Sequence, residues 1–431
     1  MFCFQNTLEA QGFTHMSAKS YLLAYVIFFI IFAYLVYRPL PDGFTKSTRD
    51  RFLMHIFEPS LRVSYYWPSR FFFSNVSGMV WWTRIVLNGL SPILGVRWAF
   101  SSLIRTEEHV WKGVPTTVYY PVGESSTNGA VIFIHGGGFA LGNVAMYDTL
   151  TRRMAERLNS VVISIDYRLS PETPFPGGLL DCERAIEYFL SIAQKEYGVD
   201  TNKIVIMGDS AGGNLAAVVT QRRKIRGEKQ FAGQVLMYPL MQMADLQSVS
   251  YRYYQKNLEG FALVDPESVV LYYMFYAGID MDEHRELAQH VLNNSHVSLE
   301  HRHIVQKYLR YHEFAQANYS GEALPPRPEI RDHRRLQEML APWITNPDFS
   351  PIMRKDLSGL PKAFVMTCEF DVLRDEGIMY ARRLQEAGIP TTLQNYENGF
   401  HAMLNFHDEI EEASRSLEDI IHWTNHTMVM A

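Results

Sequence analysis

The stretch that decides the fold is Gly208-Asp209-Ser210-Ala211-Gly212, a G-x-S-x-G pentapeptide near the middle of the chain. A short apolar run, residues 203–207, precedes it, and small residues follow it over 213–219. Strand, sharp turn and helix form the context in which such a pentapeptide presents a nucleophilic serine on a strained turn. We therefore predict that Ser210 is a nucleophile and that Asp209 supports the turn. Taken alone, the pattern occurs by chance, and a glycine-rich turn with a buried serine is the alternative.

A second glycine-rich turn lies upstream, at the end of another apolar run over residues 130–139 (AVIFIHGGGF). A loop of this kind supplies backbone N–H groups that stabilise the negative charge on a carbonyl oxygen during acyl transfer. The residue after the nucleophile adds its own N–H. The predicted donors of this oxyanion hole are Gly136, Gly137 and Ala211. A merely flexible loop is disfavoured, because the glycines end a strand and are not set among polar residues.

A third apolar run, residues 363–371 (AFVMTCEFD), ends in an acid, and residues 391–403 (TTLQNYENGFHAM) predict a last strand followed by a turn and a histidine. The chain order of serine, acid and histidine is that of α/β-hydrolases. In this arrangement His401 accepts the Ser210 proton and later protonates the leaving group, while Asp371 orients the imidazole. Ser210 carries the acyl group until water releases it.

The choice of histidine and acid rests on position. His401 is one of 15 histidines and follows a turn predicted at Asn398-Gly399, after the last strand. For the acid, strand alternation puts Glu369 and Asp371 on the same face, and Asp375 is close by. Asp371 lies nearer the end of the strand, where loops carry functional groups. It is therefore preferred, with Glu369 as the alternative.

Four blocks of sequence occur in order: HGGGF at 135–139, DYRLSPETPFP at 166–176, GDSAGGN at 208–214, and DVLRDEG at 371–377 with GFH at 399–401. Together they resemble the hormone-sensitive-lipase-like branch of the α/β-hydrolases. Within that branch the chain is most similar to the arylacetamide deacetylase and neutral cholesterol ester hydrolase family, from about Glu107 to the C-terminus. A further stretch, NNSHV at 293–297, resembles the cap segment of the same family.

The resemblance implies a carboxylesterase that acts on apolar esters or amides, with Ser210, Asp371 and His401 as its triad. It also implies an N-terminal membrane anchor and a catalytic domain in the lumen of the endoplasmic reticulum. The chain departs from the family at one point. Deacetylase relatives often carry a disulfide-bonded cysteine just after the HGGG loop, whereas Phe139 and Ala140 stand here. A receptor or binding module that kept the fold and lost a triad residue is the alternative, and the complete residue set favours an enzyme.

Composition argues against several other classes of function. Hydrophobic residues make up 47% of the 431 residues and the net charge is −6, so no nucleic-acid partner is expected. The three cysteines, Cys3, Cys182 and Cys368, are too few for a disulfide framework, and the last two are expected to be buried. Without C-x-x-C or H-E-x-x-H spacing we predict no metal site and no cofactor. The histidines of tract 296–312 are expected on a solvated helix, with metal binding the lesser alternative.

Residues 21–37 (YLLAYVIFFIIFAYLVY) carry no charge and predict a single transmembrane signal anchor after a short tail, residues 1–20. At 1.5 Å per residue the segment covers about 25 Å, the short end of the range for a lipid membrane. A cleaved signal peptide is disfavoured, because Arg38-Pro39 follows in place of a small-residue cleavage site. A buried helix is disfavoured because it usually keeps a polar stripe.

Two signals disagree on the orientation of this anchor. Lys19 precedes the segment and four cations follow it between residues 38 and 51, which by the positive-inside rule places the C-terminal side in the cytosol. The family places that side in the lumen, where N-x-S/T sequons are glycosylated, and we follow the family. The sequons after the anchor lie at Asn75, Asn293, Asn318 and Asn425.

Alternating strand and helix patterns predict an α/β-hydrolase fold, with a mostly parallel sheet covered by helices on both faces. Substrate is expected to enter between two cap segments at the carboxyl edge of the sheet. The aromatic content of the first segment predicts apolar acyl or aryl groups, with Trp81 and Trp82 at the entrance. The expected parts after the anchor are an N-terminal cap segment at 38–105, a first core part at 106–240, a cap insertion at 241–350 and a second core part at 351–431.

Overall fold

The computed structural model divides into two compact units, residues 1–39 and 40–431. Most of the predicted anchor, and all of the tail before it, lies outside the described residues. In the part of the chain that the structure describes, no helix is both long enough and apolar enough to cross a bilayer. The described residues are 25–27, 37–73, 75–95, 103–123, 128–258, 264–311 and 326–431.

An eight-stranded sheet forms the centre of the second unit, in the order β1-β2-β4-β3-β5-β6-β7-β8. The β1–β2 and β2–β4 pairs are antiparallel, and the other pairs are parallel. The prediction of a mostly parallel sheet is therefore confirmed. The strands span Ile104–Trp111 (β1), Val114–Pro121 (β2), Ala130–Ile134 (β3), Val161–Ile165 (β4), Ile204–Asp209 (β5), Gly233–Met237 (β6), Ala363–Phe370 (β7) and Thr391–Phe400 (β8).

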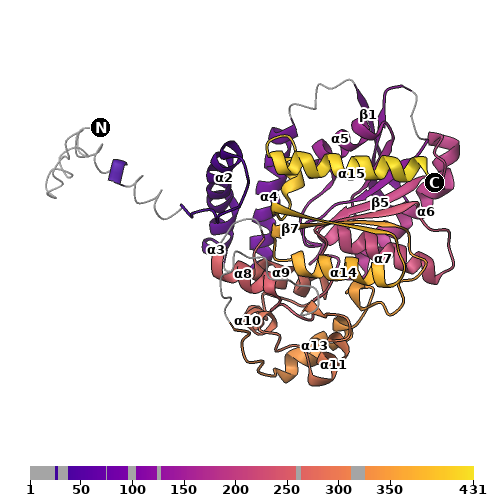
Figure 1. Ribbon diagram of the computed structural model, residues 1–431. Helices are drawn as coiled ribbons and strands as arrows, with labels where there is room; N and C mark the ends of the chain where they lie inside the picture. The colour runs from indigo at the N-terminus through magenta and orange to yellow at the C-terminus, as the bar shows by residue number, and fades with distance from the viewer. Residues whose placement is uncertain are drawn as a thin grey trace, which may run out of the picture. The chain divides into compact units, whose positions relative to one another are not determined.

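Helices cover both faces of the sheet, as predicted (Figure 1). Connections between parallel strands are right-handed. The direction from one strand to the next along the sheet therefore decides which face of the sheet the connecting helix covers. The chain steps one way from β3 to β4 and the other way from β4 to β8. Accordingly α5 packs with the C-terminal α15 on one face, while α6, α7 and α14 cover the other. These helices span Asp148–Leu158 (α5), Gly177–Tyr197 (α6), Ala211–Ile225 (α7), Arg374–Glu386 (α14) and Glu411–Val429 (α15).

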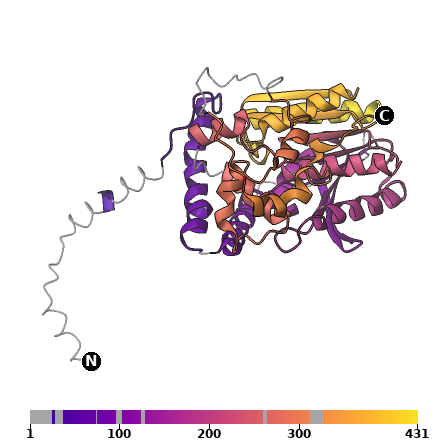
Figure 2. The ribbon, with the colours of Figure 1, turned by 90° about the horizontal axis from the view of Figure 1, so that it is seen from below.

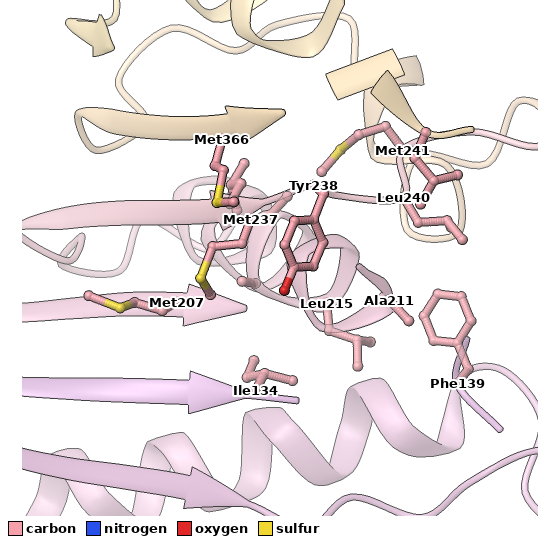
Figure 3. Close-up of a cluster of buried hydrophobic side chains, with 14 of the residues drawn as sticks. Ile134, Phe139, Met207, Ala211, Leu215, Met237, Tyr238, Leu240, Met241 and Met366 are labelled. Carbon is pink, nitrogen blue, oxygen red and sulfur yellow. The ribbon is translucent and has the colours of Figure 1, made fainter. Parts of the chain in front are cut away.

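The central strands β3, β4, β5 and β6 are buried along their whole length. Strands covered on both faces consist of continuous apolar residues, which is the pattern that made them recognisable. Ile134, Met207, Met237 and Met366 come from the neighbouring strands β3, β5, β6 and β7 and are fully buried with Leu215 of α7 (Figure 3). Burying each such side chain contributes about 1.5–3 kcal/mol. This packed layer supports the turns that follow the strands.

Two cap segments lie side by side at one side of the sheet (Figures 1 and 2). The Tyr66 hydroxyl donates to Oδ2 of Asp265 over 2.9 Å, and the Ser77 hydroxyl donates to Oδ2 of Asp282 over 2.8 Å. These bonds join segments about 200 residues apart in the chain. The first segment contains Thr48–Leu61 (α2), the π-helix Arg62–Tyr66 (η1), Trp67–Phe71 (α3) and Val76–Gly95 (α4). The second contains Val249–Asn257 (α8), Pro266–Tyr276 (α9), Arg285–Leu287 (η3), Ala288–Leu292 (α10), Leu299–Val305 (α11) and Arg334–Ile344 (α13).

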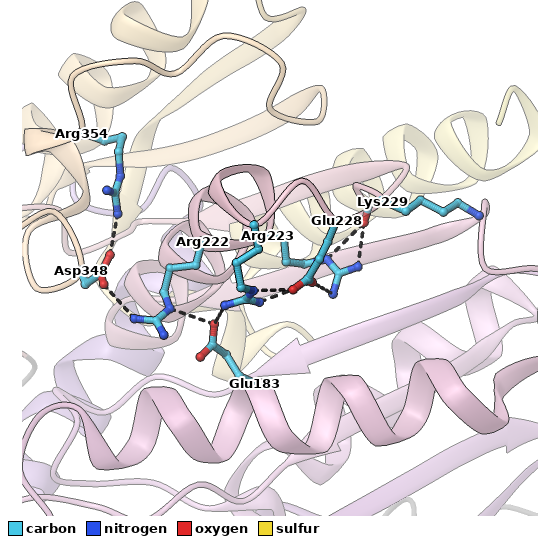
Figure 4. Close-up of polar contacts among 8 residues, drawn as sticks. Glu183, Arg222, Arg223, Glu228, Lys229, Asp348 and Arg354 are labelled. Carbon is cyan, nitrogen blue, oxygen red and sulfur yellow. Dashed lines mark hydrogen bonds and ion pairs between the residues drawn. The ribbon is translucent and has the colours of Figure 1, made fainter.

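A network of charged side chains fixes the return from the second cap segment to the core (Figure 4). Arg222 of α7 donates to Asp348 over 2.8 Å and to Glu183 of α6 over 2.9 Å. Arg354 donates to the other oxygen of Asp348. Ion pairs of this kind contribute little singly and more as a network. They hold the chain in place just before β7.

Two sequence-based expectations are wrong in their details. Asn398-Gly399 does not form a turn but lies within β8, at a bulge where Tyr396 pairs with Cys368 and Phe400 with Phe370. The pairing with β7 continues past the Asn-Gly pair, and the extra residues are accommodated as a bulge. His296 is not on a solvated helix but is fully buried. Its Nε2 lies 2.7 Å from the Met243 carbonyl oxygen, and burial lowers the pKa of the ring to about 4.

Candidate active site

Ser210 occupies the turn between β5 and α7 in a strained backbone conformation. Its φ of 52° and ψ of −120° are rare for a residue with a side chain. The glycines on either side permit this turn, because a Cβ on Gly208 would lie 2.2 Å from the Gly212 carbonyl oxygen and one on Gly212 would lie 2.0 Å from that of Ile134. The Ser210 N–H donates to the Met237 carbonyl oxygen over 2.9 Å. The turn is therefore fixed to the neighbouring strand β6.

The structure brings Ser210, His401 and Asp371 together at the carboxyl ends of β5, β8 and β7. His401 Nε2 lies 3.0 Å from the Ser210 Oγ, and His401 Nδ1 lies 2.9 Å from Asp371 Oδ2. All three side chains are buried. Asp371 Oδ1 also accepts the Leu373 N–H over 2.8 Å, which fixes the carboxylate. This geometry allows the imidazole to remove the hydroxyl proton while the carboxylate holds Nδ1–H and orients the ring.

The competing acids face elsewhere. Glu369 Oε2 accepts a hydrogen bond from Asn395 Nδ2 over 2.9 Å and lies 3.3 Å from Nε of Arg374. Asp375 accepts the Ser250 N–H over 2.8 Å. Neither carboxylate contacts His401. Glu369 lies in β7 opposite the bulge of β8, whereas Asp371 follows the end of β7.

The predicted oxyanion hole needs one correction. The Gly136 N–H donates to Asp209 Oδ1 over 2.7 Å, so it is not available to a substrate oxygen. Gly137 and Gly138, with φ of 110° and 61°, line the cavity beside Ser210. Within the described residues their N–H groups have no intramolecular acceptor. The candidate donors are therefore Gly137, Gly138 and the Ala211 N–H at the N-terminus of α7, where the helix dipole adds to the effect.

Asp209 joins the serine turn to the glycine loop. Its Oδ1 accepts the Gly136 N–H, and its Oδ2 accepts the Tyr147 hydroxyl over 2.9 Å. Burial raises the pKa of Asp209 to about 6, although both hydrogen bonds lower it. The role expected for Asp209 at the turn thus extends to the glycine loop. Nothing in the sequence pointed to Tyr147, which follows the glycine loop in a short helix, Val144–Tyr147 (η2), outside both motifs.

Arg84 of α4 is a second residue that the sequence did not reveal. Its guanidinium donates to the carbonyl oxygens of Ala140 and Ser170, each over 2.7 Å. It also makes a bidentate contact with Glu172, at 2.7 and 2.9 Å, and this hydrogen bonding lowers the pKa of Glu172. The cap segment is therefore tied to the chain that follows the glycine loop. No local motif surrounds Arg84, so only the folded structure shows the contact.

A cavity of about 260 Å³ lies over Ser210 and His401. Its walls are mainly apolar and come from both cap segments and the core. The predicted entrance residues do not line it: the Trp82 indole N–H donates to the Ser64 carbonyl oxygen over 3.0 Å, and Trp81 points to solvent. The wall residues from the two cap segments include Phe57, Leu61, Tyr65, Met79, Val80, Thr83, Leu87, Val264, Val269, Leu271, Tyr272 and Phe275.

The remaining predicted residues lie away from this cavity. Cys182 and Cys368 are buried, as predicted, and both are free thiols, with burial raising the pKa of each. Cys3 lies outside the described residues. Among the sequons, Asn75 and Asn425 are exposed, Asn293 is half-buried and Asn318 lies outside the described residues.

Comparisons with known proteins place most of the chain among similar sequences and structures. The profile of the alpha/beta hydrolase fold family matches residues 131–308 and 312–405. Neutral cholesterol ester hydrolase 1 of Pongo abelii is 33% identical over 389 residues, which cover 87% of this chain and 90% of that protein. Arylacetamide deacetylase of Rattus norvegicus is 35% identical over 310 residues, covering 70% and 75%. A solved esterase from Pyrobaculum calidifontis has a TM-score of 0.61 and 29% identity, covering 81% of this chain and 94% of that one.

Proposed function

Because the chain belongs to the α/β-hydrolase family that contains arylacetamide deacetylase and neutral cholesterol ester hydrolase, we propose that it is a carboxylesterase that hydrolyses apolar esters through Ser210, His401 and Asp371. The observation that carries the proposal is the position of His401. Its two ring nitrogens lie 3.0 Å from the serine oxygen and 2.9 Å from the carboxylate. These contacts lie below an apolar cavity.

The reaction takes place in two halves. The Ser210 Oγ attacks the acyl carbon while His401 Nε2 takes its proton, and the N–H groups of Gly137, Gly138 and Ala211 stabilise the oxyanion. His401 then protonates the leaving alkoxide, and the alcohol departs from an acyl-enzyme. Water, deprotonated by His401, attacks the acyl carbon, and Ser210 leaves with the proton returned by the imidazole. Asp371 holds Nδ1–H throughout.

The cavity wall supports an apolar substrate. Its cap-derived residues are mostly aliphatic or aromatic, with Ser69, Thr83, Asp265 and Ser268 as the polar exceptions. The relatives named after cholesterol esters and arylacetamides also suggest large apolar groups, in esters or in aryl amides. A lipid ester or an aryl ester fits this wall better than a charged one, because an unpaired charge is costly to bury.

The chain-length dependence of hydrolysis tests this proposal. With p-nitrophenyl esters from acetate to laurate, kcat/KM should rise by up to about fourfold per methylene until the cavity is filled. Leu87→Trp narrows the cavity and should move the optimum to shorter chains while leaving acetate hydrolysis nearly unchanged. Ile85→Trp, on the exposed side of the same helix, is the matched control. Equal losses at every chain length in the Leu87 variant would contradict the assigned cavity.

We further propose that residues 21–37 anchor the protein in the membrane of the endoplasmic reticulum, with the catalytic domain in the lumen. The uncharged segment and the sequons that follow it support this topology. Deletion of residues 1–37 should release the protein from carbonate-washed membranes. The catalytic domain in intact microsomes should resist added protease, and the full-length chain should be sensitive to endoglycosidase. A protease-accessible C-terminus without glycan would instead favour the cytosolic orientation.

A further inference from the structure

An exposed apolar surface covers the outer side of the first cap segment. It consists of Phe52 and Ile56 on α2, Phe71 and Phe72 at the end of α3, and Trp81 and Ile85 on α4, and we call it the outer cap face. Phe71 and Phe72 are 76% and 82% exposed, and Phe52 and Trp81 are 63% and 56% exposed. On α2 and on α4 the apolar residues are four apart, so each helix presents them on one side.

The opposite side of the same two helices lines the cavity. Phe57 and Leu61 of α2, and Met79, Thr83 and Leu87 of α4, belong to the cavity wall. A helix at a protein–water boundary normally places polar residues on its outer side. Both helices nevertheless expose large apolar side chains on the side away from the cavity, and large exposed apolar surfaces mark sites of interaction.

The position in the chain indicates what covers the outer cap face. The uncharged segment 21–37 ends ten residues before α2 begins at Thr48. Residues 38–47 can span at most about 35 Å, so α2 must stay near any bilayer that holds that segment. Aromatic residues are favoured at membrane interfaces, and Phe52, Phe71, Phe72 and Trp81 of the outer cap face are exposed aromatic residues.

We propose that the outer cap face lies in the lipid interface, so that the helices lining the substrate cavity are in contact with the bilayer that holds apolar esters. The inference rests on the proposed carboxylesterase function and adds the source of its substrate. It also makes Asn75 an unglycosylated sequon. This exposed residue lies between Phe72 and α4, and a glycan there would keep the phenylalanines out of the lipid.

Tryptophan fluorescence in vesicles tests the lipid contact without depending on catalysis. The full-length protein is reconstituted in phosphatidylcholine–phosphatidylserine vesicles with or without brominated acyl chains. Trp81→Phe should remove a large part of the quenching by brominated lipid. Trp343→Phe, in the second cap segment against Phe349, should leave it unchanged. Equal quenching in wild type and Trp81→Phe would overturn the proposal, as would a glycan found on Asn75.

Kinetics on two substrates test the consequence for activity. The double variant Phe52→Ser/Ile56→Ser should raise KM for a long-chain ester embedded in vesicles at least about tenfold. It should leave hydrolysis of soluble p-nitrophenyl acetate unchanged. The control is Val110→Ser/Ile225→Ser, which replaces two exposed apolar residues outside the cap segments. It should change neither the KM for the long-chain ester nor the hydrolysis of p-nitrophenyl acetate. Equal KM values in both double variants would contradict the proposal.

The quenching and kinetic experiments distinguish failure of the proposed esterase function from failure of the proposed lipid contact. If the wild type hydrolyses no ester, the proposed function fails while the quenching experiment still decides whether the face contacts lipid. If the Phe52→Ser/Ile56→Ser variant changes the oligomeric state in light scattering and brominated lipid does not quench Trp81, the outer cap face binds protein and the lipid proposal is wrong.

Discussion

Replacement of Ser210 by alanine should lower ester hydrolysis by about 10⁶-fold, to the level left by binding and the oxyanion hole. The reason is that the oxygen 3.0 Å from His401 Nε2 is the atom that forms the acyl-enzyme. Alanine keeps the Cβ, so the strained turn is not altered and the melting temperature should stay close to that of the wild type. The measurements are turnover of p-nitrophenyl butyrate and covalent labelling by a fluorophosphonate.

Ser164→Ala is the matched control for that variant. Ser164 is fully buried in β4, and within the described residues its hydroxyl has no hydrogen-bond partner. Its removal should leave activity and labelling unchanged. Fluorophosphonate labelling that persisted in Ser210→Ala would show that another residue is the nucleophile. Absence of labelling in the wild type would favour the non-catalytic receptor with the same fold.

Asp371→Asn should reduce kcat by about 10⁴-fold with little effect on substrate binding. An asparagine can present its N–H₂ to His401 Nδ1, which then holds the ring in the tautomer that cannot accept the serine proton at Nε2. The change is nearly isosteric, and the Leu373 N–H keeps an oxygen acceptor. Turnover under substrate saturation measures the effect.

Glu369→Gln provides the comparison, since it removes the charge of the other candidate acid. Glu369 contacts Asn395 and Arg374 and not His401, so kcat should change by no more than a few-fold. If kcat fell further in Glu369→Gln than in Asp371→Asn, the assignment of Asp371 as the acid would be wrong. His401 would then have to move towards β7 to reach Glu369.

The sequence predicts the sheet and the two side chains that contact His401, because both follow from local pattern and chain order. Strands buried on two faces leave continuous apolar runs. The carboxyl ends of parallel strands meet at one edge, so Ser210, Asp371 and His401 had to lie near one another once the strands were recognised. The resemblance in four motif blocks gave the same positions independently.

What the sequence could not predict depends on contacts between distant segments. Three consecutive glycines do not show which of their N–H groups already has an acceptor within the protein. The structure shows that the Gly136 N–H donates to the Asp209 carboxylate. The aromatic residues of the first cap segment did not show which side of α4 faces the cavity, because that helix is apolar on both sides. An Asn-Gly pair is typical of a hairpin turn, yet pairing with β7 absorbs Asn398-Gly399 into a bulge.

The Arg84 contacts make the chemistry depend on a helix outside the α/β core. The Arg84 guanidinium on α4 donates hydrogen bonds to the carbonyl oxygens of Ala140 and Ser170. Ala140 follows closely after Gly137 and Gly138, the candidate oxyanion-hole donors of the loop. Any displacement of α4 away from the core must break these bonds and loosen the loop that carries Gly137 and Gly138. If α4 must move to admit a large ester, the loop cannot stabilise the transition state until α4 has returned and the Arg84 bonds have formed again.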